Sequence, residues 1–233
     1  MGPILSIIVP LYNEENTISE IINKVQKVKI EGIEKEILIV NDGSKDKSKE
    51  VIKKLIKKYN NIKYFEHQKN RGKGAAIRTG IQHISGEYVV IQDGDLEYNP
   101  EDFKRLLRPL LEKKFDVVYG SRMLGNITGF KIFSHYYGNI LLSLVTTLLY
   151  GKKVTDMETC YKMMKSEIIK GLNLKSNKFD IEPEITSKII KKGYKLIEIP
   201  INYKSRSFIE GKKISWKDGL KAVYILIKYR FFD

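Results

Sequence analysis

The first 122 residues repeat one pattern, in which a short apolar run is followed by a polar or glycine-rich segment and then by a stretch of helical period. The apolar runs predict strands at 5–11, 36–40, 62–65, 88–92 and 116–119. The stretches between them predict helices, the first of which starts at the capping-box pair Thr17 and Glu20. Strands that alternate with helices of about 10–15 residues form βαβ units. The sequence therefore predicts an α/β fold, with a Rossmann-like, mainly parallel sheet and flanking helices.

Two aspartates, Asp93 and Asp95, follow directly on the 88–92 strand, with Gly94 between them and Glu97 two residues further on. Open α/β sheets bind ligands at the carboxyl ends of their strands. A glycine between the acids lets a bulky anion approach the backbone. Hard oxygen ligands gathered in this way suit Mg²⁺ or Mn²⁺ holding a diphosphate. The sequence predicts such a metal site, and a solvated acidic turn is the alternative.

Four other polar segments also stand at predicted strand ends, where a parallel sheet gathers them into one cleft. Glu14 and Asp42 offer oxygens to a base or a ribose, and Lys73 at a helix start offers charge and free backbone N–H groups to a diphosphate. The spacing fits neither a P-loop nor the dinucleotide fingerprint, which argues against an ATPase or a dehydrogenase. The four segments are 9–14 (VPLYNE), 41–44 (NDGS), 70–76 (NRGKGAA) and 120–122 (GSR).

Together with the Asp93–Asp95 pair, these segments resemble the inverting glycosyltransferases of family 2, which have the GT-A fold. Within that family the chain is most similar to the polyprenyl-phosphate branch, typified by dolichol-phosphate mannose synthase. The resemblance covers nearly the whole chain, because it continues through 155–162, 179–185, 198–203, Arg206 and 210–213. We expect a GT-A domain over 1–208, with a nucleotide-sugar half at 1–122 and an acceptor half at 123–208, followed by a basic amphipathic segment at 209–233.

The resemblance also implies which side chains bind each part of the substrates. The nucleotide would be bound by Pro10, Tyr12, Glu14, Asp42, Lys73 and Asp93, and Mg²⁺ or Mn²⁺ by Asp93, Asp95 and Glu97. The acceptor phosphate would be bound by Arg122, Lys131, Ser134, Arg206 and Lys212, and the catalytic residues would be Asp93, Asp95, Arg122 and Arg206. This chain departs from many relatives at two positions: it has Glu97 where they have a glutamine, and Lys131 where they have an arginine. The first departure adds negative charge at the metal, and the second leaves the acceptor clamp less defined.

The implied reaction is the transfer of a hexose, of mannose or glucose type, from a GDP- or UDP-sugar to polyprenyl phosphate. The second pKa of a phosphate monoester is about 6, so the acceptor phosphate is mostly ionised at neutral pH. As the attacking group it therefore needs positioning more than a general base. A glycosyltransferase with a soluble or polysaccharide hydroxyl acceptor is the alternative, and it would need a base. Asp156 and Glu158 are the candidates for that base, or are structural.

The net charge of +14 favours anionic partners. A nucleic-acid-binding protein is the non-enzyme alternative, but the sequence holds no zinc-finger, RNP-like or helix-turn-helix signal. The uncharged helix predicted at 132–150 has an apolar stripe, with its polar side chains largely on the other side, which suits the membrane interface; a buried core helix is the alternative. The basic helix predicted at 220–232, which follows a second capping-box pair at Ser215 and Asp218, suits an anionic membrane surface, and packing onto the domain is the alternative. With a single cysteine, Cys160, and no signal-peptide pattern, we expect a cytoplasmic protein, peripheral on the cytosolic membrane face. The sequence does not decide whether a membrane-spanning partner subunit is needed.

Overall fold

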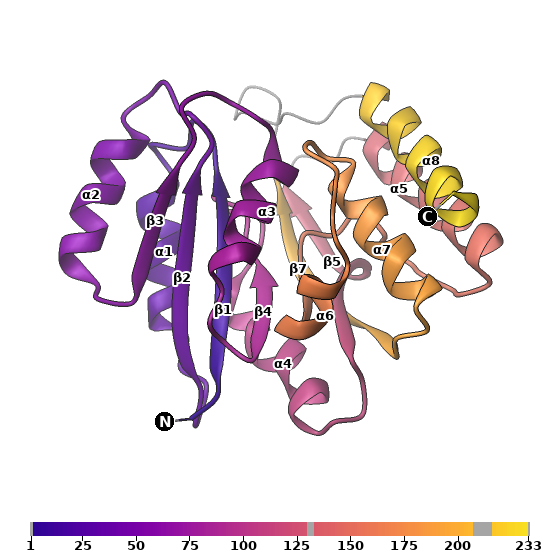
Figure 1. Cartoon of the computed structure of the whole chain (residues 1–233), viewed down its shortest axis with the longest axis horizontal. Helices are drawn as coiled ribbons and strands as arrows, with labels where there is room; N and C mark the ends of the chain where they lie inside the picture. The colour runs from indigo at the N-terminus through magenta and orange to yellow at the C-terminus, as the bar shows by residue number, and fades with distance from the viewer. Residues whose placement is uncertain (1, 130–132, 207–215, 233) are drawn as a thin grey trace.

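In the described part of the chain, seven strands form one sheet, and helices cover both of its faces (Figure 1). The computed structural model describes residues 2–129, 133–206 and 216–232. The strand order is β3-β2-β1-β4-β6-β5-β7. The strands are β1 (Ile4–Leu11), β2 (Glu34–Asn41), β3 (Ile62–Glu66), β4 (Tyr88–Ile91), β5 (Val117–Gly129), β6 (Lys162–Lys165) and β7 (Leu196–Ser205).

The helices lie between these strands, and three of them, α5, α7 and α8, pack together at one end of the molecule (Figure 1). They are α1 (Ile18–Lys27), α2 (Ser48–Lys58), α3 (Lys73–His83), the short 3₁₀ helix η1 (Pro100–Asp102), α4 (Phe103–Leu111), α5 (Phe133–Tyr150), α6 (Ser166–Gly171), α7 (Ile181–Lys191) and α8 (Trp216–Phe231).

The α/β fold with a mainly parallel sheet is confirmed. The first four predicted strands are β1 to β4, with bounds that differ by at most two residues, and these strands pair in parallel. The antiparallel strand β6 lies between β4 and β5 and was not predicted. The predicted end of the fifth strand at residue 119 is wrong, because β5 bends at an irregularity between Ser121 and Asn126 and continues along β7 to Gly129. The segment 120–122 therefore lies within β5 and not after it.

The predicted capping box at Thr17 and Glu20 is also wrong. The Thr17 side chain does not cap α1. Its hydroxyl contacts Glu14 Oε2 at 2.9 Å and the carbonyl oxygen of Gly94 at 3.0 Å. Thr17 thus joins the segment after β1 to the loop after β4. The second capping box, at Ser215 and Asp218, involves a residue outside the described part of the chain.

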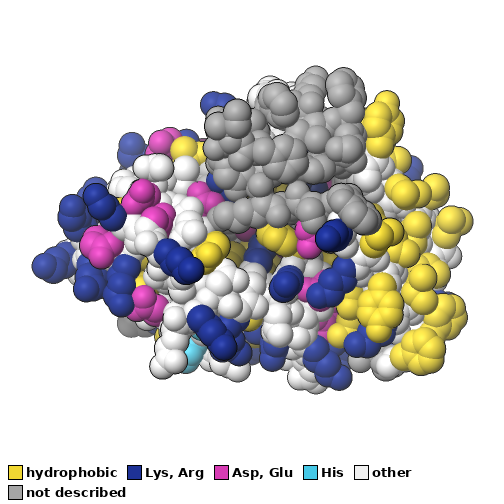
Figure 2. All heavy atoms as spheres, turned by 90° about the horizontal axis from the view of Figure 1, so that it is seen from above, with side chains coloured by type: hydrophobic (Ala, Val, Ile, Leu, Met, Phe, Trp, Pro, Cys, Tyr) yellow, Lys and Arg dark blue, Asp and Glu magenta, His cyan; other side chains and the backbone are white. Residues whose placement is uncertain are grey.

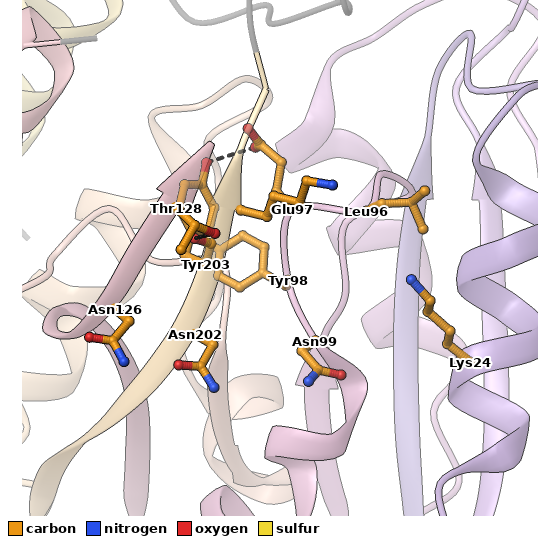
Figure 3. Close-up of a pocket in the computed structure, with 10 residues that line it drawn as sticks. Lys24, Leu96, Glu97, Tyr98, Asn99, Asn126, Thr128, Asn202 and Tyr203 are labelled. Atoms are coloured by element: carbon orange, nitrogen blue, oxygen red, sulfur yellow. Dashed lines mark hydrogen bonds between the residues drawn. The ribbon is translucent and has the colours of Figure 1, made fainter. Parts of the chain in front are cut away.

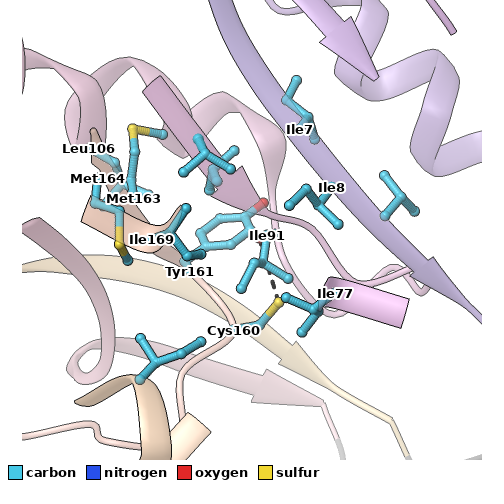
Figure 4. Close-up of a cluster of buried hydrophobic side chains, with 14 of the residues drawn as sticks. Ile7, Ile8, Ile77, Ile91, Leu106, Cys160, Tyr161, Met163, Met164 and Ile169 are labelled. Atoms are coloured by element: carbon cyan, nitrogen blue, oxygen red, sulfur yellow. Dashed lines mark hydrogen bonds between the residues drawn. The ribbon is translucent and has the colours of Figure 1, made fainter. Parts of the chain in front are cut away.

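Cys160 and Tyr161 fix the end of β4 from within the hydrophobic core (Figure 4). The Cys160 thiol contacts the carbonyl oxygen of Ile91 at 3.5 Å, and the Tyr161 hydroxyl donates a hydrogen bond to Gln92 Oε1 at 2.6 Å. Cys160 is free and buried, as its residue type predicts. The first contact holds the backbone of Ile91 and the second holds the side chain of Gln92, the two residues just before Asp93, so the core positions the acidic loop.

Helix α5 buries its polar side and exposes its apolar side. Asn139, Ser143 and Thr146 are buried, whereas Leu144 is 53% and Leu148 75% exposed. The burial of the hydroxyls is tolerated because Ser143 donates to the carbonyl oxygen of Thr155 at 3.1 Å and Thr146 to that of Leu142 at 2.8 Å. The alternative of a buried core helix is therefore wrong for most of the apolar stripe of α5, of which Val145 and Leu149 pack against the core.

Exposed hydrophobic side chains of α5 and α8 form one surface, which we call the apolar face. Figure 2 shows hydrophobic side chains gathered on the side of the molecule where these helices lie. A surface of this kind on a single chain marks a site of contact with a membrane or another molecule. None of the described helices is long and apolar enough to cross a bilayer. The apolar face consists of Tyr136, Tyr137, Ile140, Leu141, Leu144, Leu148, Leu220, Tyr224, Ile227 and Phe231.

Candidate active site

Lys73, at the start of α3, joins two acidic side chains from distant parts of the chain. Its ammonium lies 2.8 Å from Asp93 Oδ1 and 3.3 Å from Glu182 Oε1. Burial alone would raise the pKa of Asp93, but the charge of Lys73 outweighs it and holds that pKa below its ordinary value. The arrangement puts a positive charge at the start of a helix beside the carboxylate that follows β4, and within that first turn the N–H of Ala75 already donates to the carbonyl oxygen of Asn177 at 3.0 Å.

The backbone of the Lys73 loop is held by Asp42, whose carboxylate is nearly fully buried. Its Oδ1 accepts from the backbone N–H of Arg71 at 2.9 Å and contacts His67 Nδ1 at 2.6 Å. Its Oδ2 accepts from the N–H of Gly72 at 2.7 Å. Gly72 has φ 102°, and a Cβ there would lie 2.3 Å from the carbonyl oxygen of Asn177, so only glycine fits. Asp42, predicted to bind the nucleoside, binds the backbone just before Lys73 in this structure.

Arg206, which directly follows β7, contacts acidic side chains of the predicted nucleotide-sugar half, 1–122. Its guanidinium is 3.1 Å from Glu14 Oε1 and 3.0 Å from Asp95 Oδ2, and its backbone N–H donates to Glu97 Oε1 at 2.8 Å. Burial, Asp93 and Glu97 together raise the pKa of Asp95 to about 7. Asp95 is therefore crowded by the carboxylates of Asp93 and Glu97. Arg206, predicted at the acceptor phosphate, supplies a cation here.

The chemistry of Asp93 and Asp95 fits Mg²⁺ or Mn²⁺, because crowded carboxylates are suitable ligands for a hard cation. Glu97 fits less well in this conformation. Its Oε2 accepts from the Tyr203 hydroxyl at 2.7 Å, and its other oxygen accepts from Arg206, so both oxygens hold β7 (Figure 3). Over the described residues, no group of three or more His, Cys, Asp or Glu side chains is arranged to hold a metal ion.

A cavity of about 520 Å³ lies beside the Glu97–Tyr203 contact (Figure 3). Asn99, Asn126 and Asn202 line it with exposed amide groups. Of the predicted site residues that the structure describes, only Glu97 lines this cavity, and the same carboxylate accepts a hydrogen bond from the backbone of Arg206.

Arg122, in β5, is paired with a fully buried carboxylate. Its Nε and Nη2 each lie 2.7 Å from an oxygen of Asp156, and its backbone N–H donates to the same carboxylate at 2.8 Å. Burial would raise the pKa of Asp156, but Arg122 outweighs it and lowers that pKa. The Asp156 loop is held in turn by Glu198, which accepts from the N–H groups of Thr155 and Asp156 at 2.7 and 3.0 Å. Asp156 therefore positions Arg122 and is poorly suited to act as a base.

Sequence reasoning missed two buried charges that complete the cluster, Lys162 and Glu182. The Lys162 ammonium lies 2.6 Å from Glu182 Oε2 and donates to the carbonyl oxygens of Met157 and Thr159 at 2.9 and 2.5 Å. Burial, followed by the charge of Glu182, raises the pKa of Glu158 to about 7. No sequence motif marks Lys162 or Glu182, and the two residues become neighbours only in the folded chain.

The remaining predicted residues are less informative. Pro10 lies in β1, and Tyr12 follows that strand partly buried. Lys131 and Lys212 lie outside the described residues, as does the side chain of Ser134 in α5. The described residues thus bring the predicted nucleotide and metal residues to one edge of the sheet, and Arg122 to the adjoining strand β5.

The family model described as Glycosyl transferase family 2 matches residues 6–172. The chain is 30% identical to a dolichyl-phosphate beta-glucosyltransferase of Trichomonas vaginalis over 98% of this chain and 73% of that protein. It is 26% identical to a dolichol-phosphate mannosyltransferase of Pyrococcus furiosus over 97% of this chain and 64% of that protein.

The fold is also similar to that of glucosyl-3-phosphoglycerate synthase from Mycobacterium tuberculosis, crystallised with Mn²⁺, uridine diphosphate and phosphoglyceric acid. The TM-score is 0.74 at 16% identity, over 100% of this chain and 80% of that one.

Proposed function

The chain belongs to glycosyl transferase family 2 and is a glycosyltransferase of the GT-A fold, and we propose that it transfers a hexose from a nucleotide sugar to polyprenyl phosphate at a membrane surface. Two relatives are named for transfer to dolichyl phosphate, one of glucose and one of mannose. The donor is therefore a UDP- or GDP-hexose of one of these types. Transfer proceeds with inversion at the sugar carbon.

The observation that supports the proposal best is that α5 contacts the predicted acceptor site with its polar side and exposes apolar side chains on the other side. Its buried side contacts the loop that positions Arg122, because Ser143 donates to the carbonyl oxygen of Thr155. Its other side exposes leucines and tyrosines of the apolar face. A polyprenyl chain stays in the bilayer, so an enzyme that uses its phosphate must come to the membrane. The helix joins an anion-binding arginine to a surface suited to lipid.

In the donor half, Lys73 neutralises the diphosphate that leaves during transfer, and the N–H groups at the start of α3 bind its oxygens. Asp93 and Asp95 hold the divalent metal, which supplies further positive charge to the leaving group when bound. Arg206 then gives up its contacts with Glu14 and Asp95, and its guanidinium becomes available to the acceptor phosphate.

In the acceptor half, Arg122 orients the lipid phosphate, with Asp156 fixing the plane of the guanidinium. The phosphate oxygen attacks the sugar carbon already ionised, so positioning replaces a strong general base. This assignment agrees with the geometry of Asp156, because both of its carboxylate oxygens accept hydrogen bonds from Arg122.

The apolar face binds the membrane peripherally, and basic side chains of α8 add electrostatic attraction. Lys217, Lys221, Lys228 and Arg230 lie along this helix. Each basic residue near an anionic surface contributes about 1 kcal/mol, and salt screens that contribution but not apolar insertion. We therefore place the enzyme on the cytosolic face, where anionic lipids are concentrated.

A hydroxyl acceptor is the second candidate, and one observation favours it. Glu158 has a pKa of about 7, raised by burial and by Glu182, which suits a general base at neutral pH. In that case the acceptor would be soluble and the apolar face would serve another purpose.

The two candidates are separated by product analysis. Purified protein is incubated with radiolabelled UDP- and GDP-sugars and Mg²⁺ or Mn²⁺, in one reaction with polyprenyl phosphate and in a parallel reaction with soluble sugars and polysaccharides as hydroxyl acceptors. Label in the organic extract of the first reaction supports the proposal. Labelled acceptor in the second reaction alone, separated from unreacted donor, supports the hydroxyl acceptor, and no transfer from any donor in either reaction contradicts both.

A further inference from the structure

Glu158 has a buried oxygen without a partner. Its Oε1 is inaccessible to solvent and accepts no hydrogen bond from the described residues. Leaving a buried carboxylate oxygen unpaired costs free energy, so such groups in native proteins usually serve a ligand or a function. The backbone on either side is fixed, because Lys162 binds the carbonyl oxygens of both Met157 and Thr159. The unpaired oxygen is therefore held in place and is not a consequence of a loose loop.

The surroundings of Glu158 connect the donor half with the acceptor half. On one side, Lys162 contacts Glu182, and Glu182 contacts Lys73 at 3.3 Å. On the other side, Asp156 stands two residues before Glu158 and holds Arg122. The charged side chains that act most strongly on the pKa of Glu158, after burial, are Glu182, Lys162 and Arg122 in that order. Glu158 thus stands on the segment 156–162, which is bound at Asp156 to the arginine assigned to the acceptor and at Lys162, through Glu182, to the lysine assigned to the diphosphate.

During transfer, the sugar itself occupies the space between the diphosphate and the acceptor. Its hydroxyl groups are hydrogen-bond donors, and a carboxylate oxygen is a strong acceptor for them. We propose that Glu158 accepts a hydrogen bond from a hydroxyl of the transferred hexose and so helps to determine which sugar the enzyme uses. This inference rests on the proposed function, because it needs a nucleotide-sugar donor.

The role has a direct consequence for selectivity. A site that holds a buried polar group for a hydroxyl discriminates strongly against a sugar that lacks the hydroxyl or points it elsewhere, because the group is then left unpaired again. Glu158 would therefore contribute to binding of the nucleotide sugar but not to binding of the nucleoside diphosphate alone. A general base would show the opposite behaviour, with unchanged donor binding and slower turnover.

The test compares Glu158→Ala and Glu158→Gln with a matched control, Asp102→Ala. Asp102 is also buried with one unpartnered oxygen, but it pairs with Arg105 at the start of α4. Dissociation constants are measured by calorimetry for UDP, UDP-glucose, GDP and GDP-mannose with Mn²⁺ present, using the pair that the native protein binds. Thermal unfolding of each variant checks that it is folded.

We expect Glu158→Ala to weaken nucleotide-sugar binding about 10- to 100-fold, the range for a hydrogen bond to a charged group, and to change nucleoside diphosphate binding by less than about twofold. Glu158→Gln keeps an acceptor oxygen, so it should weaken nucleotide-sugar binding less than Glu158→Ala does. Asp102→Ala should change the dissociation constant of neither the nucleotide sugar nor the nucleoside diphosphate. Equal weakening of both ligands would indicate a structural role and overturn the inference. Unchanged binding with a lower kcat would indicate a base and also overturn it. Failure of the native protein to bind any nucleotide sugar would instead refute the proposed function.

Discussion

Replacing two leucines of the apolar face, Leu144 and Leu148, by serine should detach the protein from membranes without unfolding it. The two side chains are 53% and 75% exposed. Full burial of a leucine is worth about 1.5–3 kcal/mol, so burying the exposed parts of both in lipid is worth about 2–4 kcal/mol. Their loss should weaken partitioning about 30- to 900-fold. Stability should barely change, because both side chains already face water in the folded protein.

The assay is cosedimentation with vesicles of neutral and anionic lipid, at low and at high salt. Leu111→Ser is the matched control, since Leu111 is 40% exposed on α4, outside the apolar face. The native protein and the control should bind, less strongly at high salt because the basic residues of α8 are screened. If the double variant binds as well as the native protein, or if the control loses as much, the membrane role of the apolar face is refuted.

Three further changes test other parts of the site and fold. Asp95→Asn should nearly abolish transfer while the protein stays folded, and full activity of the variant, or of native enzyme in excess EDTA, would exclude a metal-binding role. Arg122→Lys keeps the charge but loses the bidentate contact with Asp156, so the KM for lipid phosphate should rise more than the KM for the donor; an effect on the donor alone would contradict this assignment. Burial would raise the pKa of Glu36, but hydrogen bonds from Lys63, Ser6 and Ser85 outweigh it and lower that pKa to about 2. The resulting stabilisation, which solvent screening limits to at most about 3 kcal/mol, is present above a pH of about 4.5 and is lost as the pH falls towards 2. Denaturant unfolding of Glu36→Gln should lose this pH dependence, and a variant that keeps it would show that the dependence arises elsewhere.

The parallel half of the sheet could be predicted because each of its strands is an apolar run that ends at a polar segment. Strand β6 could not, since Lys162–Lys165 is short and has a lysine at each end. It becomes a strand because β4 and β5 provide antiparallel partners on both sides. Lys162 is tolerated in the interior because Glu182 and two carbonyl oxygens bind its ammonium.

The site was predicted as a set of residues but not as a network of contacts. Strand ends placed Lys73 and Asp93 in one cleft, and the structure puts them 2.8 Å apart. The sequence could not show that Arg206 lies on Glu14 and Asp95, because that contact depends on how β7 ends beside β5. Glu182 was missed because an acid in the first turn of a helix ordinarily faces solvent.

The sequence pattern also could not predict which side of α5 is exposed to solvent. Periodicity separated the apolar side chains from the polar ones but did not decide which set faces the protein. Ser143 and Thr146 can be buried because their hydroxyls bind backbone carbonyl oxygens, which leaves the leucines to the surface.

The central claim, transfer to a lipid phosphate, is tested most directly by offering the enzyme polyprenyl phosphate and the corresponding polyprenol in parallel, with the same labelled nucleotide sugar. Mass spectrometry of the organic extract identifies the product. The phosphate acceptor should give a hexosyl phosphate lipid, and the alcohol should give none, because the site orients an ionised phosphate at Arg122 and has no need to deprotonate a hydroxyl. Glycosylation of the alcohol, or label that enters only water-soluble products, would contradict the account.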